Sequence, residues 1–249
     1  MSLGRLALLL TAFCPALLGA WPAAAANLKI YPVRLTLSAK APIATMTLHN
    51  AGDQPALLQM KVFGWSQKDG KDVLEPTRAV LANPAAFELA PGADQIARFG
   101  LQSADPSREQ SYRVLVQEVP PQAPGKPGEV ITLLRVSIPI FTVVARPQSH
   151  MVWKVTPLPD GKAQIDVANQ GDQHVQLTEL RLARAGGGQE LVREKLSAYV
   201  LPGASQRLVV SCTTPIRPNE ALELRAATDQ ADMQASVVSA AGPDERALQ

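Results

Sequence analysis

The chain has 249 residues and a formal net charge of only +2, from 24 basic and 22 acidic side chains. So even a balance gives no electrostatic reason to expect a nucleic-acid partner, because phosphate binding requires an excess of Lys and Arg. The length is more than one small β-sandwich needs and is sufficient for two domains of roughly 100 residues each.

Residues 1–26 have the pattern of a secretory signal peptide. Arg5 precedes an apolar run from Leu6 to Ala20, and small residues end the segment at Ala26. The run is short for a membrane span. We therefore expect cleavage before Asn27, export to the periplasm and no insertion into the membrane. Removal of Arg5 leaves 23 basic against 22 acidic residues, a net charge of +1.

Cysteine usage restricts how the exported chain is held together. Cys14 leaves with the signal peptide, and a lipoprotein anchored through it is disfavoured because the bulky Phe13 precedes it. Cys212 then has no partner within the chain. No internal disulfide can form, so the fold must depend on its buried core.

Alternation of apolar and polar residues runs from Leu28 to the end of the chain, and no segment has a sustained helical repeat. The pattern predicts an all-β protein. In the first half the expected strands are NLKIYPVRLTLS, TMTLHN, ALLQMKVFGWSQ, DQIARFGLQ, SYRVLVQEVP and ITLLRVSIPIFTVV. After an expected linker, ARPQS at 145–149, the expected strands are HMVWKVTPL, AQIDVANQ, QHVQLTELRLAR, QELVREKLSAYV, QRLVVSC, LELRAAT and MQASVVSA. Their spacing suits a second sandwich.

The stretch 131–144, ITLLRVSIPIFTVV, is too apolar for a strand with one face in water. It follows residues 120–129, PPQAPGKPGE, which are expected to form a loop between two strands of a hairpin. Its two alternating rows contain Leu134, Val136, Ile138 and Ile140, and Ile131, Leu133, Phe141 and Val143. Two interpretations are open: a central strand buried on both faces, or a strand whose second face is covered by another protein.

Five blocks of the first half occur in an order and spacing that are specific to one family. They are RLTLS, LHNAGDQPALLQMKVFGWSQKDGKD, VLANPAAFELAPGADQIARFGL, SYRVLVQEVPP, and LLRVSIPIF followed by ARP. Over residues 27 to about 147 the chain resembles the periplasmic pilus-assembly chaperones of the chaperone–usher pathway, and beyond that the resemblance is architectural. The block from Gln59 to Leu74, with SIPIF, is closer to the branch that serves archaic, spore-coat-U-like pili.

The resemblance implies two immunoglobulin-like β-sandwiches set at an angle, with a cleft between them. The N-terminal domain would span 27–147 and carry a donor strand, and the C-terminal domain would span 148–249. It implies a chaperone that binds, folds and caps pilin subunits by donor-strand complementation, delivers them to an outer-membrane usher, and needs no cofactor or metal. Strand addition provides main-chain hydrogen bonds, and alternate side chains in pockets provide register. Self-association of the free chaperone through its bare donor strand stays open.

By this resemblance the stretch 131–144 is the donor strand, and we assign the donating row to Leu134, Val136, Ile138 and Ile140 because that row is unbroken. Leu133 and Phe141 are the candidates if the opposite row donates. Pro139 removes one backbone donor and indicates a local bulge or an interruption of the outward pairing.

The resemblance also indicates a carboxylate anchor for the end of the pilin chain. Arg34, within VRLTL, matches the cleft arginine of the family, and a guanidinium suits this charge-assisted contact. The family's lysine on the last strand is replaced here by Thr142. Arg113 would lie near the end of the returning strand of the hairpin and is the candidate for the second positive charge. The alternative is a structural Arg113 paired with Glu118 or water.

Other functions find little support. His49, His150 and His174 lie on unrelated expected turns and strands, and the chain lacks HExxH, GxSxG and a Gly-rich phosphate loop. The pair His150 and Met151 is a weak copper motif, so no metal site is expected. The alternative to a chaperone is a periplasmic two-domain ligand-binding or adhesion module, with an exported hydrolase a distant third.

Overall fold

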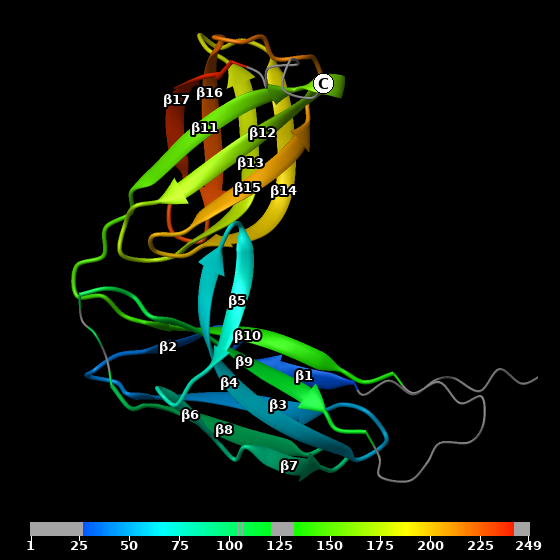
Figure 1. Ribbon diagram of the computed structural model, residues 1–249. Helices are drawn as coiled ribbons and strands as arrows, with labels where there is room; N and C mark the ends of the chain where they lie inside the picture. The colour runs from blue at the N-terminus through cyan, green and yellow to red at the C-terminus, as the bar shows by residue number, and fades with distance from the viewer. Residues whose placement is uncertain (1–26, 104, 106, 121–131, 242–249) are drawn as a thin grey trace, which may run out of the picture.

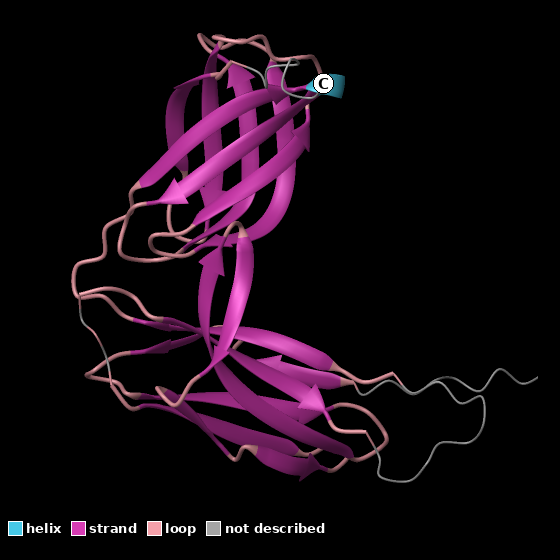
Figure 2. Cartoon of the chain, viewed as in Figure 1, coloured by secondary structure: helices cyan, strands magenta, loops and turns pink. Residues whose placement is uncertain are grey.

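The computed structural model describes residues 27–103, 105, 107–120 and 132–241. The expected signal peptide, Ile131 and nearly all of the expected loop at 120–129 lie outside this range. The described chain is built from β-strands that form two sandwiches, one above the other in Figure 1, at an angle to each other. Figure 2 shows that loops, with few exceptions, connect strand to strand. The predicted all-β fold with two sandwiches is confirmed.

The first sandwich consists of two sheets that enclose one apolar core. Its strands are β1 (Leu28–Tyr31), β2 (Leu35–Leu37), β3 (Ile43–Asn50), β4 (Ala56–Lys68), β5 (Lys71–Pro76), β6 (Val80–Asn83), β7 (Ala86–Leu89), β8 (Asp94–Leu101), β9 (Ser111–Glu118) and β10 (Arg135–Thr142). One sheet has the order β1-β3-β8-β6 and the other the order β2-β10-β9-β4-β5, with β7 beside β4. The N-terminal segment therefore crosses from one sheet to the other between β1 and β2.

The second sandwich contains the seven strands that were predicted for it. They are β11 (Met151–Leu158), β12 (Lys162–Asn169), β13 (Val175–Arg184), β14 (Glu190–Val200), β15 (Ser205–Ser211), β16 (Ala221–Thr228) and β17 (Met233–Val238), with one 3-10 turn at Pro159–Gly161. Their sheets have the orders β11-β12-β15 and β14-β13-β16-β17. The alternating apolar residues of these strands face inward and form a separate core.

Three strands of the first sandwich were not predicted. The strands β5, β6 and β7 are short, and their residues are mostly exposed or only partly buried. Without a fully buried apolar row, such segments have no alternation to detect. The predicted strand NLKIYPVRLTLS is in fact two strands, because the chain bends at Val33 and Arg34.

The same turn sequence, N-x-G-D-Q, occurs once in each sandwich, starting at Asn50 and at Asn169. Each asparagine amide is buried, donates to two backbone carbonyl groups, and accepts from the glycine two residues later. These hydrogen bonds fix the turn into the next strand in the same way. The fifth residue after the asparagine differs: it is the exposed Pro55 in the first sandwich and the buried His174 in the second.

The hairpin of β4 and β5 extends from the first sandwich toward the second, as Figure 1 shows. Asp69 and Gly70 both have positive φ angles, as a two-residue hairpin turn requires. The tip lies against Gln206 and Arg207 of β15. The side-chain amide of Gln67 donates to the carbonyl oxygen of Tyr199 at 2.9 Å and accepts from the N–H of Leu201 at 3.0 Å.

The strand β10 places the predicted donor row in its own core, which corrects our assignment. Ile138 and Ile140 are 1 % and 0 % exposed within the core of the first sandwich, and Val136 packs against that core. Leu134, just before β10, is partly buried. The row is unbroken because its own sandwich needs it, and Arg135 and Ser137 point the other way, into solvent.

The second apolar row of the stretch is buried in part by the same chain. Phe141 is 2 % exposed and packs with Trp65 and with Leu201 of the second sandwich. The interpretation of a strand buried on both faces therefore holds for its C-terminal end. Leu133 and Val143 of that row are exposed.

Candidate functional site

The cleft between the sandwiches gathers charged and aromatic side chains from both. Its position within VRLTL had indicated that Arg34 lies inside a strand. In the structure Arg34 lies in the bend before β2. Its guanidinium donates to Asp229 Oδ2 at 2.6 Å, to Gln176 Oε1 at 2.5 Å and to the Tyr199 hydroxyl at 3.3 Å. All three acceptors belong to the second sandwich, so Arg34 bridges the two.

The charges of Arg34 and Asp229 stabilise each other. Burial alone would lower the pKa of Arg34, but its hydrogen bonds to Tyr199 and Asp229 leave that pKa raised. Burial alone would raise the pKa of Asp229. The nearby His174 ring and the hydrogen bonds from the backbone N–H of Gln176 and from Arg34 overcome this effect and lower the pKa of Asp229 to about 2.

His174 lies beside this pair and joins it to the first sandwich. Its Nδ1 is within 2.8 to 2.9 Å of both carboxylate oxygens of Glu109, which also accepts its backbone N–H. Its Nε2 lies 3.5 Å from Asp229 Oδ2. The ring stacks on Phe141 with centroids 3.5 Å apart and an interplanar angle of 7°. Burial lowers the pKa of His174, but the carboxylates of Asp229 and Glu109 outweigh it, and the pKa is raised.

Arg113, on β9, lies near both Trp65 and Tyr199. Its guanidinium carbon is 3.7 Å from the Trp65 ring centroid and 5.4 Å from that of Tyr199, while Arg34 is 5.9 Å from the latter. Its acidic neighbour is Asp72, at 3.8 Å, rather than the Glu118 considered from the sequence. Burial lowers the pKa of Arg113. The two arginines thus both face Tyr199 in the cleft.

A pocket of about 160 Å³ opens beside Arg34. Thr142, at the position of the missing lysine, lines it and is 2 % exposed, and its Oγ1 accepts the N–H of Gln110 at 2.7 Å. Phe141, Glu109 and His174 also line the pocket. A negatively charged group that entered it would meet Arg34 and His174 together.

One edge of β10 is open over Arg135–Pro139. β9 pairs with β10 along Arg135–Phe141, whereas β2 pairs only with Ile140–Thr142, and no other described strand takes the free edge. The bonds from Glu118 to Leu134 and from Thr142 to Gln110 show that even-numbered residues face β9. The N–H and C=O groups of Arg135 and Ser137 therefore face the open edge. The C=O of Pro139 faces the N–H of Leu35, where the pairing with β2 begins.

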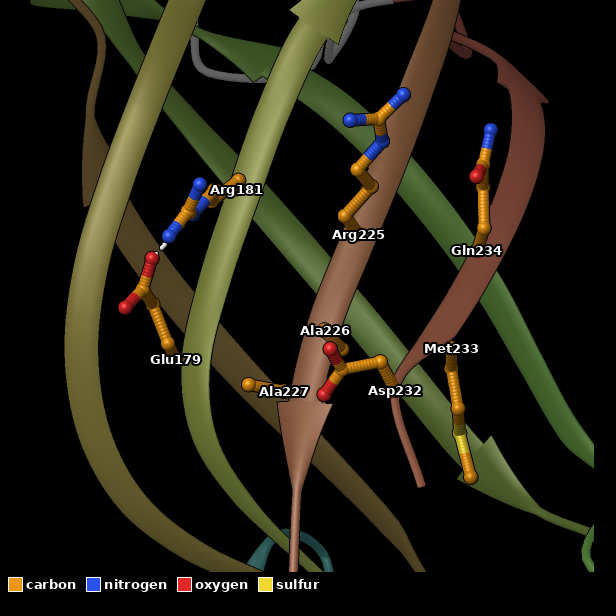
Figure 3. Close-up of a pocket in the computed structure, with 8 residues that line it drawn as sticks. All are labelled: Glu179, Arg181, Arg225, Ala226, Ala227, Asp232, Met233 and Gln234. Atoms are coloured by element: carbon orange, nitrogen blue, oxygen red, sulfur yellow. Dashed lines mark hydrogen bonds and ion pairs between the residues drawn. The ribbon is translucent and has the colours of Figure 1, made fainter.

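A larger hollow of about 460 Å³ lies on the outward face of β13 and β16, shown in Figure 3. Its two arginines each have an acidic neighbour on the same strand. Arg181 pairs with Glu179, and Arg225 lies 3.6 Å from Glu223. These pairs are exposed to solvent, so the hollow has the character of a solvated sheet surface.

Among the residues that the structure describes, no three His, Cys, Asp or Glu side chains are grouped as a metal site would need. Within the same residues no helix is long and apolar enough to cross a membrane.

Sequence reasoning found Arg34 and Arg113 but missed Glu109, His174 and Asp229. These residues are 65 and 55 positions apart along the chain, and no local motif connects them. One detectable pattern was the repeated N-x-G-D-Q turn, in which a buried histidine replaces the exposed proline of the first copy.

Two immunoglobulin-like sandwiches, a charged cleft between them and an open strand edge define a class of two-domain β-proteins. The family model described as pili and flagellar-assembly chaperone, PapD N-terminal domain, matches residues 27–150. Residues 27–150 therefore belong to the PapD N-terminal domain family of pili and flagellar-assembly chaperones, and the resemblance noted in the sequence is confirmed. No curated protein sequence matches the chain.

Solved structures of pilus chaperones have the same fold. A chain of the CsuC–CsuE chaperone–tip adhesion subunit pre-assembly complex, from the archaic Csu pili of Acinetobacter baumannii, is 20 % identical with a TM-score of 0.62, over 88 % of this chain and 100 % of its own. The YadV chaperone is 16 % identical with a TM-score of 0.58, over 85 % and 99 %. A chain of the Salmonella enterica SafA pilin–SafB chaperone complex is 19 % identical with a TM-score of 0.56, over 86 % and 99 %.

Proposed function

We propose that this protein is a periplasmic chaperone that binds, folds and caps pilin subunits by strand addition and delivers them to an outer-membrane usher. The observation that carries the proposal is the open edge of β10 at Arg135–Pro139, next to the Arg34 pocket. An incomplete pilin sandwich presents the complementary open edge, and pairing the two satisfies the backbone groups of both. Binding and folding supply the energy, so no catalytic step is needed.

The two rows of the stretch 131–144 have roles that differ from our first assignment. The row of Val136, Ile138 and Ile140 supports the strand from inside its own sandwich. We propose that the opposite row faces the subunit, with Leu133 as its exposed apolar member on the N-terminal side of β10. Register then depends on side chains outside β10 as well as on backbone pairing.

Arg34 is the proposed anchor for the terminal carboxylate of the pilin. A terminal carboxylate occurs once per subunit, so clamping it sets how far the two strands slide along each other. Arg113 is proposed to add a second positive charge from beside Tyr199. Residues 1–26 are proposed to direct export. The archaic CsuC–CsuE chaperone–subunit complex among the similar folds supports pilus subunits as the partners.

The alternative of a small-molecule receptor is not separated from a chaperone by cavity volume. The pocket beside Arg34 measures about 160 Å³, below the about 300 to 1,000 Å³ typical of small-ligand pockets, but two other hollows between the sandwiches measure about 320 and 390 Å³. The open edge of β10 favours the chaperone, because strand addition satisfies its backbone groups and a small ligand does not.

The test is co-purification of the chain from periplasm that also expresses the pilins of neighbouring genes. We expect a small β-rich subunit to copurify and to be degraded in a strain that lacks the chaperone. Recovery of the chain alone, with those pilins equally abundant in the deletion strain, would refute the proposal.

The anchor has its own test on a pilin with its native C-terminus. Arg34→Ala is expected to weaken binding about tenfold to a hundredfold, since a charged hydrogen bond in such a cleft contributes about 1.5 to 3 kcal/mol. Arg113→Ala is expected to weaken binding to a smaller extent because its guanidinium lies over Trp65. Binding by Arg34→Ala equal to wild type excludes the anchor.

A further inference from the structure

The Arg34 pocket and the Asp229 carboxylate beside it carry an unbalanced set of charges whose sum depends on one proton. Glu109 and Asp229 are carboxylates, Arg34 is a guanidinium, and His174 lies between the two carboxylates. With a neutral imidazole the four groups sum to −1, and with a protonated imidazole they sum to zero. With a neutral imidazole the net negative charge therefore repels a further carboxylate, and with a protonated imidazole this repulsion is absent.

Every element packed against His174 contributes to its environment. Glu109 comes from the segment before β9, Asp229 from the segment after β16, Arg34 from the bend before β2 and Tyr199 from β14. Phe141 of β10 covers the ring face and carries no charge. The side chains of Glu109 and His174 are only 6 % and 9 % exposed, so water screens their charges little.

We propose that His174 is a positioning residue which, when protonated, frees Arg34 to bind the terminal carboxylate of the subunit. The inference rests on the proposed function, because it adds proton control to the anchor at Arg34. It assigns to a histidine outside the donor strand a role in deciding when the cleft accepts a partner.

The geometry explains how protonation acts. A protonated imidazole donates through Nδ1 to Glu109 and directs its Nε2–H to Asp229, which then shares its charge between His174 and Arg34. A neutral imidazole keeps the Glu109 bond, and its Nε2 lone pair then faces the Asp229 carboxylate at 3.5 Å. Asp229 must then rely on Arg34, so the guanidinium is held by its own chain.

Linkage fixes the direction of the effect. If protonation of His174 favours the bound carboxylate, the carboxylate must equally favour protonation of His174. Because the pKa of His174 is already raised above 6.5 in the free protein, the imidazole is protonated at pH 6 and loses its proton as the pH rises. Affinity for a carboxylate should therefore fall with rising pH above that value.

The experiment uses the full chaperone and a synthetic peptide with the sequence of the last strand of a co-purifying pilin. The peptide is made with a free carboxylate and, separately, with a C-terminal carboxamide. We expect the acid peptide to bind about fivefold more weakly at pH 9 than at pH 6, within the usual range of coupling. The amide peptide should bind with no such change. In NMR titrations of wild type, the acid peptide alone should raise the pKa of the His174 imidazole.

Two variants separate a role in gating from a role in structure. His174→Gln should bind the acid peptide with the same affinity at both pH values. His49→Gln removes an exposed His–Asp pair on β3 and β8, and should keep the wild-type pH dependence.

Each other outcome overturns the inference. Equal affinity of wild type for the acid peptide at pH 6 and pH 9, or a dependence that persists in His174→Gln, excludes gating by His174 while leaving the chaperone function intact. Failure of the acid peptide to bind at either pH excludes the Arg34 anchor and the gating inference with it, whereas the chaperone function is tested separately by co-purification of the pilin.

Discussion

The two halves of β10 have the same kind of sequence but different surroundings. Over Ile140–Thr142 the strand has neighbours on both edges, core beneath it and the second sandwich above it through Phe141. Over Arg135–Pro139 it has β9 on one edge only, and its outward residues Arg135 and Ser137 are exposed. Apolar composition alone therefore does not identify a binding strand. The open edge does, because it leaves backbone groups without partners.

The largest expected effect comes from a charge in the half of β10 that has neighbours on both edges. Ile140→Asp places a carboxylate where the side chain is 0 % exposed, and should cost about 4 kcal/mol or more and unfold the first sandwich. Ile138→Asp should do the same. Ser137→Asp, on the solvent side, is the matched control and should melt near wild type in urea and heat. A folded Ile140→Asp would return the even row to the list of donor residues.

A smaller effect is expected where β10 meets the second sandwich. Phe141→Ala removes the ring that stacks on His174 and packs with Trp65 and Leu201, and should cost about 3 kcal/mol. The loss falls on the contact between sandwiches, so calorimetry should separate one melting transition into two. Val143→Ala, at an exposed neighbour, should change neither. An unaltered transition in Phe141→Ala would mean that the cluster contributes little to the interface.

A change in the backbone tests the half of β10 that is paired on one edge only. Ser137→Pro removes an N–H that faces the free edge while leaving the bonds of the even residues to β9. We expect a folded protein whose pilin binding is about tenfold weaker, equivalent to one lost hydrogen bond of about 1.4 kcal/mol. Ser137→Ala keeps the N–H and should bind normally. Wild-type binding by Ser137→Pro would place the partner elsewhere.

The smallest effect concerns the charges beside the half of β10 that has neighbours on both edges. The pKa of Asp229 in the folded protein is about 2, below its ordinary 3.8, so this carboxylate contributes stability above pH 3.8 that is lost as the pH falls through 2. The lowering from 3.8 to about 2 corresponds to about 2.4 kcal/mol, and solvent screening in the open cleft reduces the contribution to about 1 kcal/mol. The raised pKa of His174 acts in the opposite sense: its contribution is present below pH 6.5 and is lost as the pH rises through the raised value.

Urea unfolding between pH 2 and pH 9 measures both contributions. Asp229→Asn should flatten the acid side, and His174→Gln should flatten the alkaline side. A wild-type stability that stays constant from pH 5 to pH 2 would contradict the assignment for Asp229.

The sequence predicted the second sandwich well because each of its strands has a buried apolar row, as in Lys162–Asn169 and Ala221–Thr228. The family pattern predicted that Arg34 lies in the cleft between the sandwiches. Periodicity gave the wrong row for β10, since an unbroken apolar row is what any core-facing strand requires, and exposure depends on partners that periodicity does not reveal. The His174 network was beyond reach because its members come from both sandwiches and meet only in three dimensions.

The hairpin of β4 and β5 gives the molecule a second attachment besides the connection after β10. A contact at this hairpin, added to the covalent connection, restricts bending between the two sandwiches. Each residue removed from both strands would shorten the hairpin by about 3.4 Å and would withdraw Gln67 from the backbone of Tyr199 and Leu201. The length of one surface hairpin thereby becomes a dimension of the cleft, adjustable by insertion or deletion without altering Arg34, Glu109 or His174.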